Sequence, residues 1–285
     1  MSDFSTDDNH VWFTSSFFYD IEKWYLVLAE MENFILQLNK DAFIYYQVSL
    51  NYAPVYTIQF AMLFQNEHMM DDIGKRFFDY FTQFKEKNKP EKYIVEVKGI
   101  GLPYPTNTFH IGLNSIPYNK NGHATYNIQE NFTKLIFAGL KTETFTQEDT
   151  HTLAIYAILV LGKAILNYNQ QVAKEVFINL QNDYFLHGQS IKNVFPEEYD
   201  EISNLSKQLL SVEDIIKEEP WLATWYEFCK TYIFNYLNNQ SEPIQIESKI
   251  KDLYINKIGL IANQLGIPTK TSTTLLSLVN CSLIF

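Results

Sequence analysis

The sequence predicts an α+β fold in which a ferredoxin-like α/β sandwich is followed by a mostly helical half. Over the first 125 residues, aromatic and β-branched segments alternate with segments of helical periodicity, in the order strand, helix, strand, strand, helix, strand. From residue 131 onward, apolar residues recur mainly at helical spacing. Aromatic residues make up 16% of the chain, and burying that much aromatic surface requires a substantial core.

Each element of the first half has a local signal in the sequence. Over 21–38, apolar residues lie on one face of a predicted helix, for which Asp20 is available as an N-cap. Phenylalanines repeat at the same spacing over 71–84 and predict a second helix. Strands are predicted at 12–18, 42–50, 55–64, 93–97 and 108–113.

The second half contains a series of predicted helices. They span 131–140, 150–166, 173–185, 199–210, 222–237, 250–265 and 271–283. The Pro-rich run 101–105 and the turn 119–123 are typical of loops inside the first half and not of domain linkers. We therefore expect one domain over 1–285, with an α/β part at 1–125 and a mainly helical part at 126–285.

The charge and the first residues of the chain exclude several classes of protein. A formal charge of -11 disfavours nucleic-acid binding, because phosphate recognition needs dense Lys and Arg patches. The first nine residues are polar and acidic, unlike a secretory signal. We find no stretch long enough to span a bilayer. These features predict a soluble cytoplasmic protein with no membrane and no nucleic-acid partner.

The usual signatures of cofactor-dependent chemistry are missing from the sequence. The six histidines are scattered, and the two cysteines, Cys229 and Cys281, each lie alone in apolar surroundings, so we expect no metal site. Gly99 and Gly101 are not followed by a helix start, which argues against a nucleotide-binding loop. We find no Gly-x-Ser-x-Gly motif. We therefore expect no cofactor.

Two local features have a functional and a structural interpretation. The tyrosines of the predicted strands, Tyr45, Tyr46, Tyr52 and Tyr56, could stack on a flat ligand, but tyrosines on a half-buried sheet commonly serve packing. His110 could be a general acid or base, or a hydrogen-bonded histidine on an edge strand. The residues alone leave both questions open.

Segments in the same order along the chain resemble the C-terminal domain of class I lanthipeptide dehydratases, which also occurs as standalone thiopeptide-type bacteriocin biosynthesis proteins. The segment from His10 to Phe18 resembles the family's Trp-led first strand. Phe43-Ile-Tyr-Tyr46 resembles its Phe-Ile-Arg-Tyr strand, and Pro54-Val-Tyr-Thr-Ile-Gln-Phe60 resembles Pro-His-Leu-Arg-Leu-Arg-Phe. These matches place Tyr45, Thr57 and Gln59 where the family has arginines.

The resemblance continues through the helical half. The segment from Thr125 to Phe132 is similar to Thr-Tyr-x-Pro-Glu, although the arginine and glycines that follow in the family are missing. Phe145 with Asp149-Thr150 resembles Phe-x-x-Asp-Ser. Gly259-Leu-Ile-Ala-Asn-Gln-Leu265 is similar to His-Met-x-x-Asn-Arg-Leu, with Gly259 at the histidine and Gln264 at the arginine.

The departures from the family pattern indicate which reaction is lost. In the family, arginines hold the carboxylates of a glutamylated Ser or Thr during elimination, but this chain has a single arginine, Arg76, outside these motifs. Thr or Gln does not replace bidentate recognition by a guanidinium group. The chain is therefore not expected to be a glutamate-eliminating dehydratase.

The resemblance instead implies a thiopeptide pyridine synthase. Such an enzyme joins two dehydroalanines of a leader-bearing precursor peptide in a formal [4+2] aza-cycloaddition and releases water and the leader peptide to form a pyridine-centred macrocycle. The resemblance implies that neutral residues bind the substrate, some of them retained from the family pattern and the others standing where the family has arginines. These residues are Tyr45, Tyr46, Thr57, Gln59, Asn263 and Gln264. Candidates for proton transfer are Tyr254, Lys257 and His110.

Alternatives to catalysis stay open at this point. The chain could be a non-catalytic partner that holds a precursor peptide or another biosynthetic enzyme, since loss of several active-site residues also fits such a role. It could also be an unrelated α+β protein. A homodimer is a further possible assembly.

Overall fold

The computed structural model describes residues 10–52, 56–88, 104–112, 123–141, 146–183, 216–217, 219–238, 246–268, 271, 277, 279–280 and 283. They belong to two compact units, Met1–Gln147 and Glu148–Phe285. The predicted strand 93–97, the predicted helix 199–210 and most of the predicted helix 271–283 lie outside the described residues, as do Val55 and Phe145.

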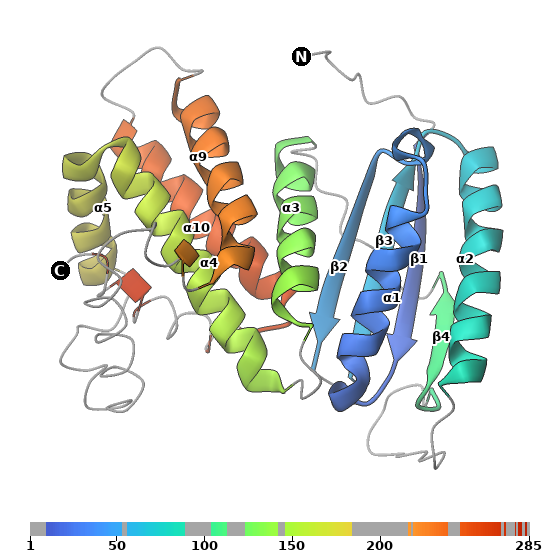
Figure 1. Cartoon of the computed structure of the whole chain (residues 1–285). Coiled ribbons are helices and arrows are strands. Elements are labelled where there is room, and N and C mark those ends of the chain that lie inside the picture. Colours follow the sequence, from blue (N-terminus) through green and yellow to red (C-terminus); the bar gives the residue numbers. More distant parts are fainter. Residues whose placement is uncertain are drawn as a thin grey trace. The chain divides into compact units, whose positions relative to one another are not determined.

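The first unit contains a four-stranded sheet in the order β2-β3-β1-β4 (Figure 1). Its elements along the chain are β1 (Val11–Phe18), α1 (Trp24–Leu36), β2 (Tyr45–Asn51), β3 (Thr57–Phe64), α2 (Glu67–Lys87) and β4 (Thr108–Ile111). Each neighbouring pair of strands is antiparallel. This topology is the ferredoxin-like sandwich predicted from the sequence, and the α+β class is confirmed.

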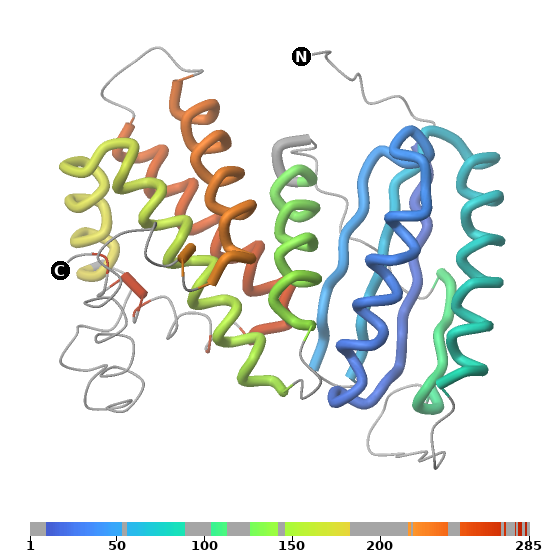
Figure 2. Tube along the Cα trace, viewed as in Figure 1, coloured from blue at the N-terminus to red at the C-terminus, as the bar shows by residue number. Residues whose placement is uncertain are grey.

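A layer of phenylalanines joins one face of the sheet to α1 and α2, which lie on the same side of it (Figure 2). Phe60 of β3 stacks on Phe77 of α2 with ring centroids 5.4 Å apart and planes within 4°. Phe34 of α1 meets Phe77 edge-on at 5.3 Å. Phe17 of β1 contacts both Phe77 and Phe81. This face of the sheet therefore forms the core of the first unit.

The start of α1 differs from its predicted form. A 3-10 turn, Ile21–Lys23, precedes the helix, and Asp20 occupies the N-cap of that turn without a side-chain capping bond. Instead, the backbone carbonyl of Asp20 accepts from the N–H of Lys23 at 2.8 Å. Lys23 is the N-cap residue of the α-helix itself.

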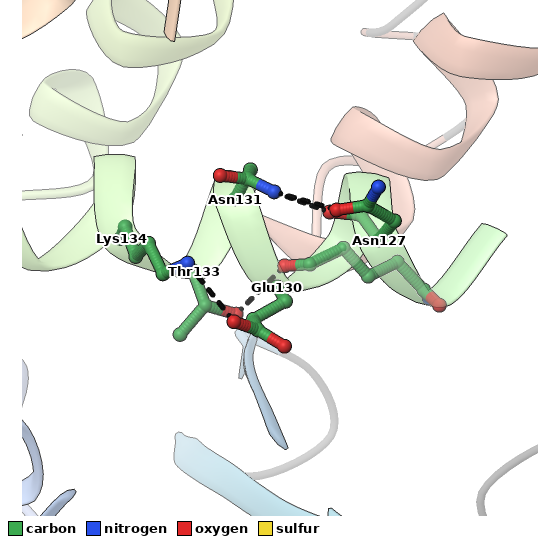
Figure 3. Close-up of polar contacts among 6 residues, drawn as sticks. Asn127, Glu130, Asn131, Thr133 and Lys134 are labelled. Atoms are coloured by element: carbon green, nitrogen blue, oxygen red, sulfur yellow. Dashed lines mark hydrogen bonds and ion pairs between the residues drawn. The ribbon is translucent and has the colours of Figure 1, made fainter. Parts of the chain in front are cut away.

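Helix α3 (His123–Gly139) lies against β2, the first strand of the sheet order (Figure 1). Thr133 Oγ1 accepts a 3.0 Å hydrogen bond from the backbone N–H of Val48, which satisfies a donor on the outer edge of that strand. Asn131 donates to Asn127, and Lys134 pairs with Glu130 along the same helix (Figure 3). The helix begins earlier than the predicted residue 131, and the first unit continues past residue 125 to include it.

The second unit is helical where it is described. It contains α4 (Gln147–Tyr168), α5 (Gln170–Asp183), α9 (Ala223–Asn238) and α10 (Ile246–Gln264). Its core runs along α4, and Trp225 of α9 donates its indole N–H to the carbonyl of Ala157 at 3.0 Å. Phe177 of α5 packs on Tyr254 of α10 with ring centroids 4.8 Å apart.

Helix α4 corrects one expectation from the sequence. At 22 residues it is long and apolar enough to cross a membrane, although no such stretch was expected. Within the protein, 61% of its most apolar window is buried. The apolar length of α4 is thus accounted for by its place in the core of the second unit.

Candidate functional site

The face of the sheet opposite α1 and α2 carries many polar side chains. Because side chains alternate across a strand, the residues that do not point at the phenylalanine layer share this second face. We define the polar face by seven of its hydrogen-bonding strand residues, Thr14, Ser16, Gln47, Ser49, Thr57, Gln59 and His110. The four described strands contain no Asp, Glu, Lys or Arg.

One row of the polar face crosses all four strands. The register pairs Ser49 with Gln59, Gln59 with Ser16, and Ser16 with His110. Side chains paired in this way across neighbouring strands lie about 5 Å apart. These four residues, called the central row below, form a continuous line of hydroxyl, amide and imidazole groups.

Much of the polar face is removed from water. Ser16 is 2% exposed and Gln47 is 8% exposed, while Gln59, Ser49 and His110 are half-buried. Hydrogen-bonding groups lose free energy on burial unless they find partners. An uncharged set of buried donors and acceptors suits a neutral, hydrogen-bonding ligand and offers no cation for a carboxylate.

Tyr45 anchors the end of the polar face that is next to α3. Its ring packs on Trp12 and Tyr126 at centroid distances of 5.7 and 4.8 Å. Its hydroxyl lies 2.6 Å from Gln47 Oε1, to which it donates, and 3.3 Å from Gln129 Oε1. Burial raises the pKa of the phenol far above its usual range, so Tyr45 is a neutral hydrogen-bonding group.

Of the other predicted substrate-binding residues in the first unit, two share the polar face and one does not. Thr57 and Gln59 alternate with the buried Ile58 and Phe60 on β3, and Gln59 is part of the central row. Tyr46 pairs with Met62, which places it on the face packed against α1 and α2. Burial raises the pKa of Tyr46, and Glu130 and Glu32 raise it further.

His110 occupies the last position of the central row, on β4. Its ring lies 4.4 Å from the ring of Tyr104 and 5.6 Å from that of Phe18. The Nε2 atom is buried and has no hydrogen-bond partner among the described residues. Burial lowers the pKa of His110, and the nearby Lys85 ammonium lowers it further. The imidazole is therefore neutral at pH 7 and has one unengaged nitrogen.

The remaining predicted site residues lie on α10 in the second unit. Tyr254 is fully buried against Phe177, and burial raises its pKa. In the part of the chain that the structure describes, its hydroxyl has no hydrogen-bond partner. Lys257 is half-buried with Nζ 5.3 Å from the centre of the Tyr232 ring, and burial lowers its pKa. Gln264 is 3% exposed, whereas its neighbour Asn263 is exposed.

Sequence reasoning missed part of the polar face. Ser16, Gln47 and Ser49 belong to it, and Gln129 contacts Tyr45 from α3. The signal that could have found them is the alternation of uncharged polar residues with large apolar residues along the strands 12–18 and 42–50. Their pairing into one row required the strand register, which the sequence does not state.

Comparisons with known proteins agree with this geometry at the level of the fold. No protein-family model and no curated protein matches the sequence. Among solved structures, pyridine synthase TbtD from thiomuracin biosynthesis superposes with a TM-score of 0.65 at 11% identity, covering 95% of this chain and 97% of that one. This chain shares the fold of that pyridine synthase. The resemblance predicted from the sequence is confirmed at the level of the fold.

A second solved structure carries the same fold as part of a longer protein. The tRNA-dependent lantibiotic dehydratase MibB from Microbispora sp. 107891 superposes with a TM-score of 0.60 at 9% identity. The match covers 99% of this chain but 28% of the dehydratase. The chain therefore spans about a quarter of the dehydratase and nearly all of the pyridine synthase.

Proposed function

We propose that this protein is a pyridine synthase of thiopeptide biosynthesis, acting in the cytoplasm on a leader-bearing ribosomal peptide that contains two dehydroalanines. A formal [4+2] aza-cycloaddition joins the two alkenes through two new carbon–carbon bonds. Water and the leader peptide, released as an amide, then depart and leave an aromatic pyridine. The overall reaction is redox-neutral.

The observation that carries this proposal is a fold shared over nearly the full length of a pyridine synthase, with an uncharged polar face in its sheet. A glutamylated substrate needs cations for its carboxylates. The single arginine, Arg76, is exposed on α2, and α2 covers the opposite face of the sheet. A substrate of amides and alkenes instead needs neutral donors and acceptors.

The polar face can serve the reaction in two ways. The half-buried Gln59 amide and Ser49 hydroxyl supply hydrogen bonds that hold the peptide and favour the amide tautomer that acts as the azadiene, and the buried Ser16 lies beside Gln59 in the same row. Tyr45 and Thr57 extend the same surface. His110, with its neutral imidazole and unengaged Nε2, is the strongest candidate to move a proton.

The candidate residues of α10 differ in how well they could transfer a proton or bind the substrate. A fully buried phenol with a raised pKa, as in Tyr254, is a poor proton donor, and the half-buried Lys257 with its lowered pKa is a better one. Gln264 and Asn263 stay candidate substrate-binding residues on the last turn of α10. Tyr46, on the packed face of the sheet, acts through the position of its neighbour Tyr45.

The competing function is a non-catalytic partner that holds the precursor peptide or another biosynthetic enzyme. One observation favours it: the Tyr45 hydroxyl is buried and already bonded within the protein, to Gln47 and Gln129. A polar face that is satisfied internally could be purely structural.

Mass spectrometry of the purified chain with the bis-dehydroalanine peptide, without any added cofactor, tests the proposal. Loss of water together with release of the leader as a carboxamide supports it, and tight binding with unchanged mass supports the partner function. We expect Gln59→Leu to slow ring formation by roughly tenfold or more. Gln65→Leu, at an exposed residue just after β3, is the matched control and should react like the wild type.

A further inference from the structure

Aromatic rings are stacked along one stripe of α9 in the second unit. The centroids of Trp225 and Phe228 are 5.5 Å apart with planes at 26°, and those of Phe228 and Tyr232 are 5.8 Å apart at 28°. Tyr232 and Tyr236 continue the stack at 6.1 Å and 16°. Residues three and four apart share one side of a helix. These four residues are called the aromatic ladder.

The ladder borders the buried side of α9 and does not belong entirely to the core. Trp225 is fixed at one end by its hydrogen bond to Ala157. Further along the helix, the core positions are Ile233 and Leu237, whereas Phe228, Tyr232 and Tyr236 are half-buried. Nearly parallel rings that are fixed by a helix and remain partly accessible form a surface on which another flat ring can stack.

Lys257 adds a positive charge beside this surface. Its Nζ lies 5.3 Å from the centre of the Tyr232 ring. The ion pairs among the described residues join Lys134 to Glu130, Lys141 to Glu32 and Lys230 to Glu227, and none of them involves Lys257. A half-buried ammonium group without a carboxylate partner in the described part of the chain can donate to an oxygen brought by a ligand.

We propose that the aromatic ladder and Lys257 bind a planar aromatic ring that carries a carbonyl or carboxylate oxygen. The ring packs against the partly exposed sides of Phe228 and Tyr232, and the oxygen accepts a hydrogen bond from the Lys257 ammonium. The identity of the biological ligand rests on the proposed function and deepens it. The bound group is then an aromatic ring of the modified peptide together with its adjoining backbone carbonyl.

The test uses small probes and no turnover, so its failure is distinct from failure of the proposed function. Ligand-observed NMR titrations of the full chain compare naphthalene-2-carboxylate with its saturated analogue, decahydronaphthalene-2-carboxylate. The planar probe should bind roughly three to ten times more tightly, because stacking adds to the burial of apolar area. Naphthalene-2-carboxamide, which lacks the charge, should bind more weakly than the carboxylate.

Two variants and a matched control assign the site. Tyr232→Leu should remove the preference for the planar probe, and Lys257→Met should remove the preference for carboxylate over carboxamide. Phe234→Leu changes an aromatic residue of the same helix that is 58% exposed and outside the ladder, so it should leave both preferences unchanged. Thermal melts check that each variant is folded. If Tyr232→Leu is not folded, Lys257→Met alone tests the site.

Three results would overturn the proposal. The first is equal binding of the planar and saturated probes by the wild-type chain. The second is an equal loss of binding in Tyr232→Leu and Phe234→Leu. The third is self-association of the wild-type chain that Tyr232→Leu abolishes, because a second copy would then cover the ladder.

Discussion

Ser15 and Ser16 are neighbours on β1 with opposite surroundings. Ser15 points into the phenylalanine layer, where its buried hydroxyl has no hydrogen-bond partner within the described ranges. Ser16 lies in the central row between Gln59 and His110. Ser15→Ala should raise the free energy of unfolding by about 1 kcal/mol, since it removes an unsatisfied buried group. Ser16→Ala should slow ring formation roughly tenfold, because it removes one hydrogen-bonding group from the central row between Gln59 and His110.

These two variants are controls for each other. Chemical denaturation measures the free energy of unfolding, and mass spectrometry measures the rate of ring formation. If Ser15→Ala slows the reaction as much as Ser16→Ala does, the polar face is not where the substrate binds.

His110 links the stability of the protein to pH. Because its pKa is lower in the folded protein than the usual value of about 6.5, the unfolded chain binds a proton first as the pH falls. The free energy of unfolding should therefore decrease from pH 7 towards pH 5. His110→Gln should make this decrease shallower, with His151, whose pKa burial also lowers, accounting for part of the remainder. Denaturation at a series of pH values measures both slopes, and identical slopes would refute the assignment.

Single residues of the candidate site were predictable where a family pattern marked them or, for His110, where a titratable side chain stood in a predicted strand. Tyr45, Thr57 and Gln59 were found because they stand where the family has arginines, and all lie on the polar face. Tyr46 came from the same strand but lies on the other face, because adjacent residues of a strand point in opposite directions. Serines such as Ser16 and Ser49 carry no motif of their own.

Two glycines of the second unit provide a test at the level of elements. A Cβ on Gly162 of α4 would lie 2.3 Å from Leu283 Cδ1, in a packed contact, whereas a Cβ on Gly259 of α10 would meet nothing within 4 Å. Gly162→Ala should lower the free energy of unfolding by about 1–3 kcal/mol through overpacking. Gly259→Ala should raise it by about 0.5–1 kcal/mol, because alanine favours a helix.

Thermal and urea denaturation of both variants measure these changes. The same sign for the two substitutions would contradict the packing of Leu283 on α4. Both glycines lie inside helices, so helix propensity alone would predict the same sign for both substitutions. The expected difference in sign therefore comes from tertiary contacts.

Helices were easier to predict than their ends. The apolar periodicity located α1, α2, α4, α5, α9 and α10 within a few residues. The first turns of α3 were missed because that segment carries polar residues, Asn127 and Asn131 among them, that bond to each other along the helix. The 3-10 turn before α1 was missed because Asp20 has the composition of a cap but uses its backbone carbonyl.

At the scale of the whole molecule, the order of elements along the chain was sufficient to predict the ferredoxin-like sandwich. The strand order β2-β3-β1-β4 was not predicted separately and comes from the structure. The division into two compact units at Gln147 was not foreseen, because no Pro- or Gly-rich linker marks it. A single domain over the full chain stays a prediction.

The central claim is that an uncharged site has replaced glutamate elimination by pyridine formation. The most direct measurement is mass spectrometry of the purified chain given two leader-bearing peptides together, one with two dehydroalanines and one with a glutamylated serine. We predict that the first peptide loses water and its leader as a carboxamide, while the second keeps its mass. An unchanged first peptide, or loss of glutamate from the second, would contradict the claim.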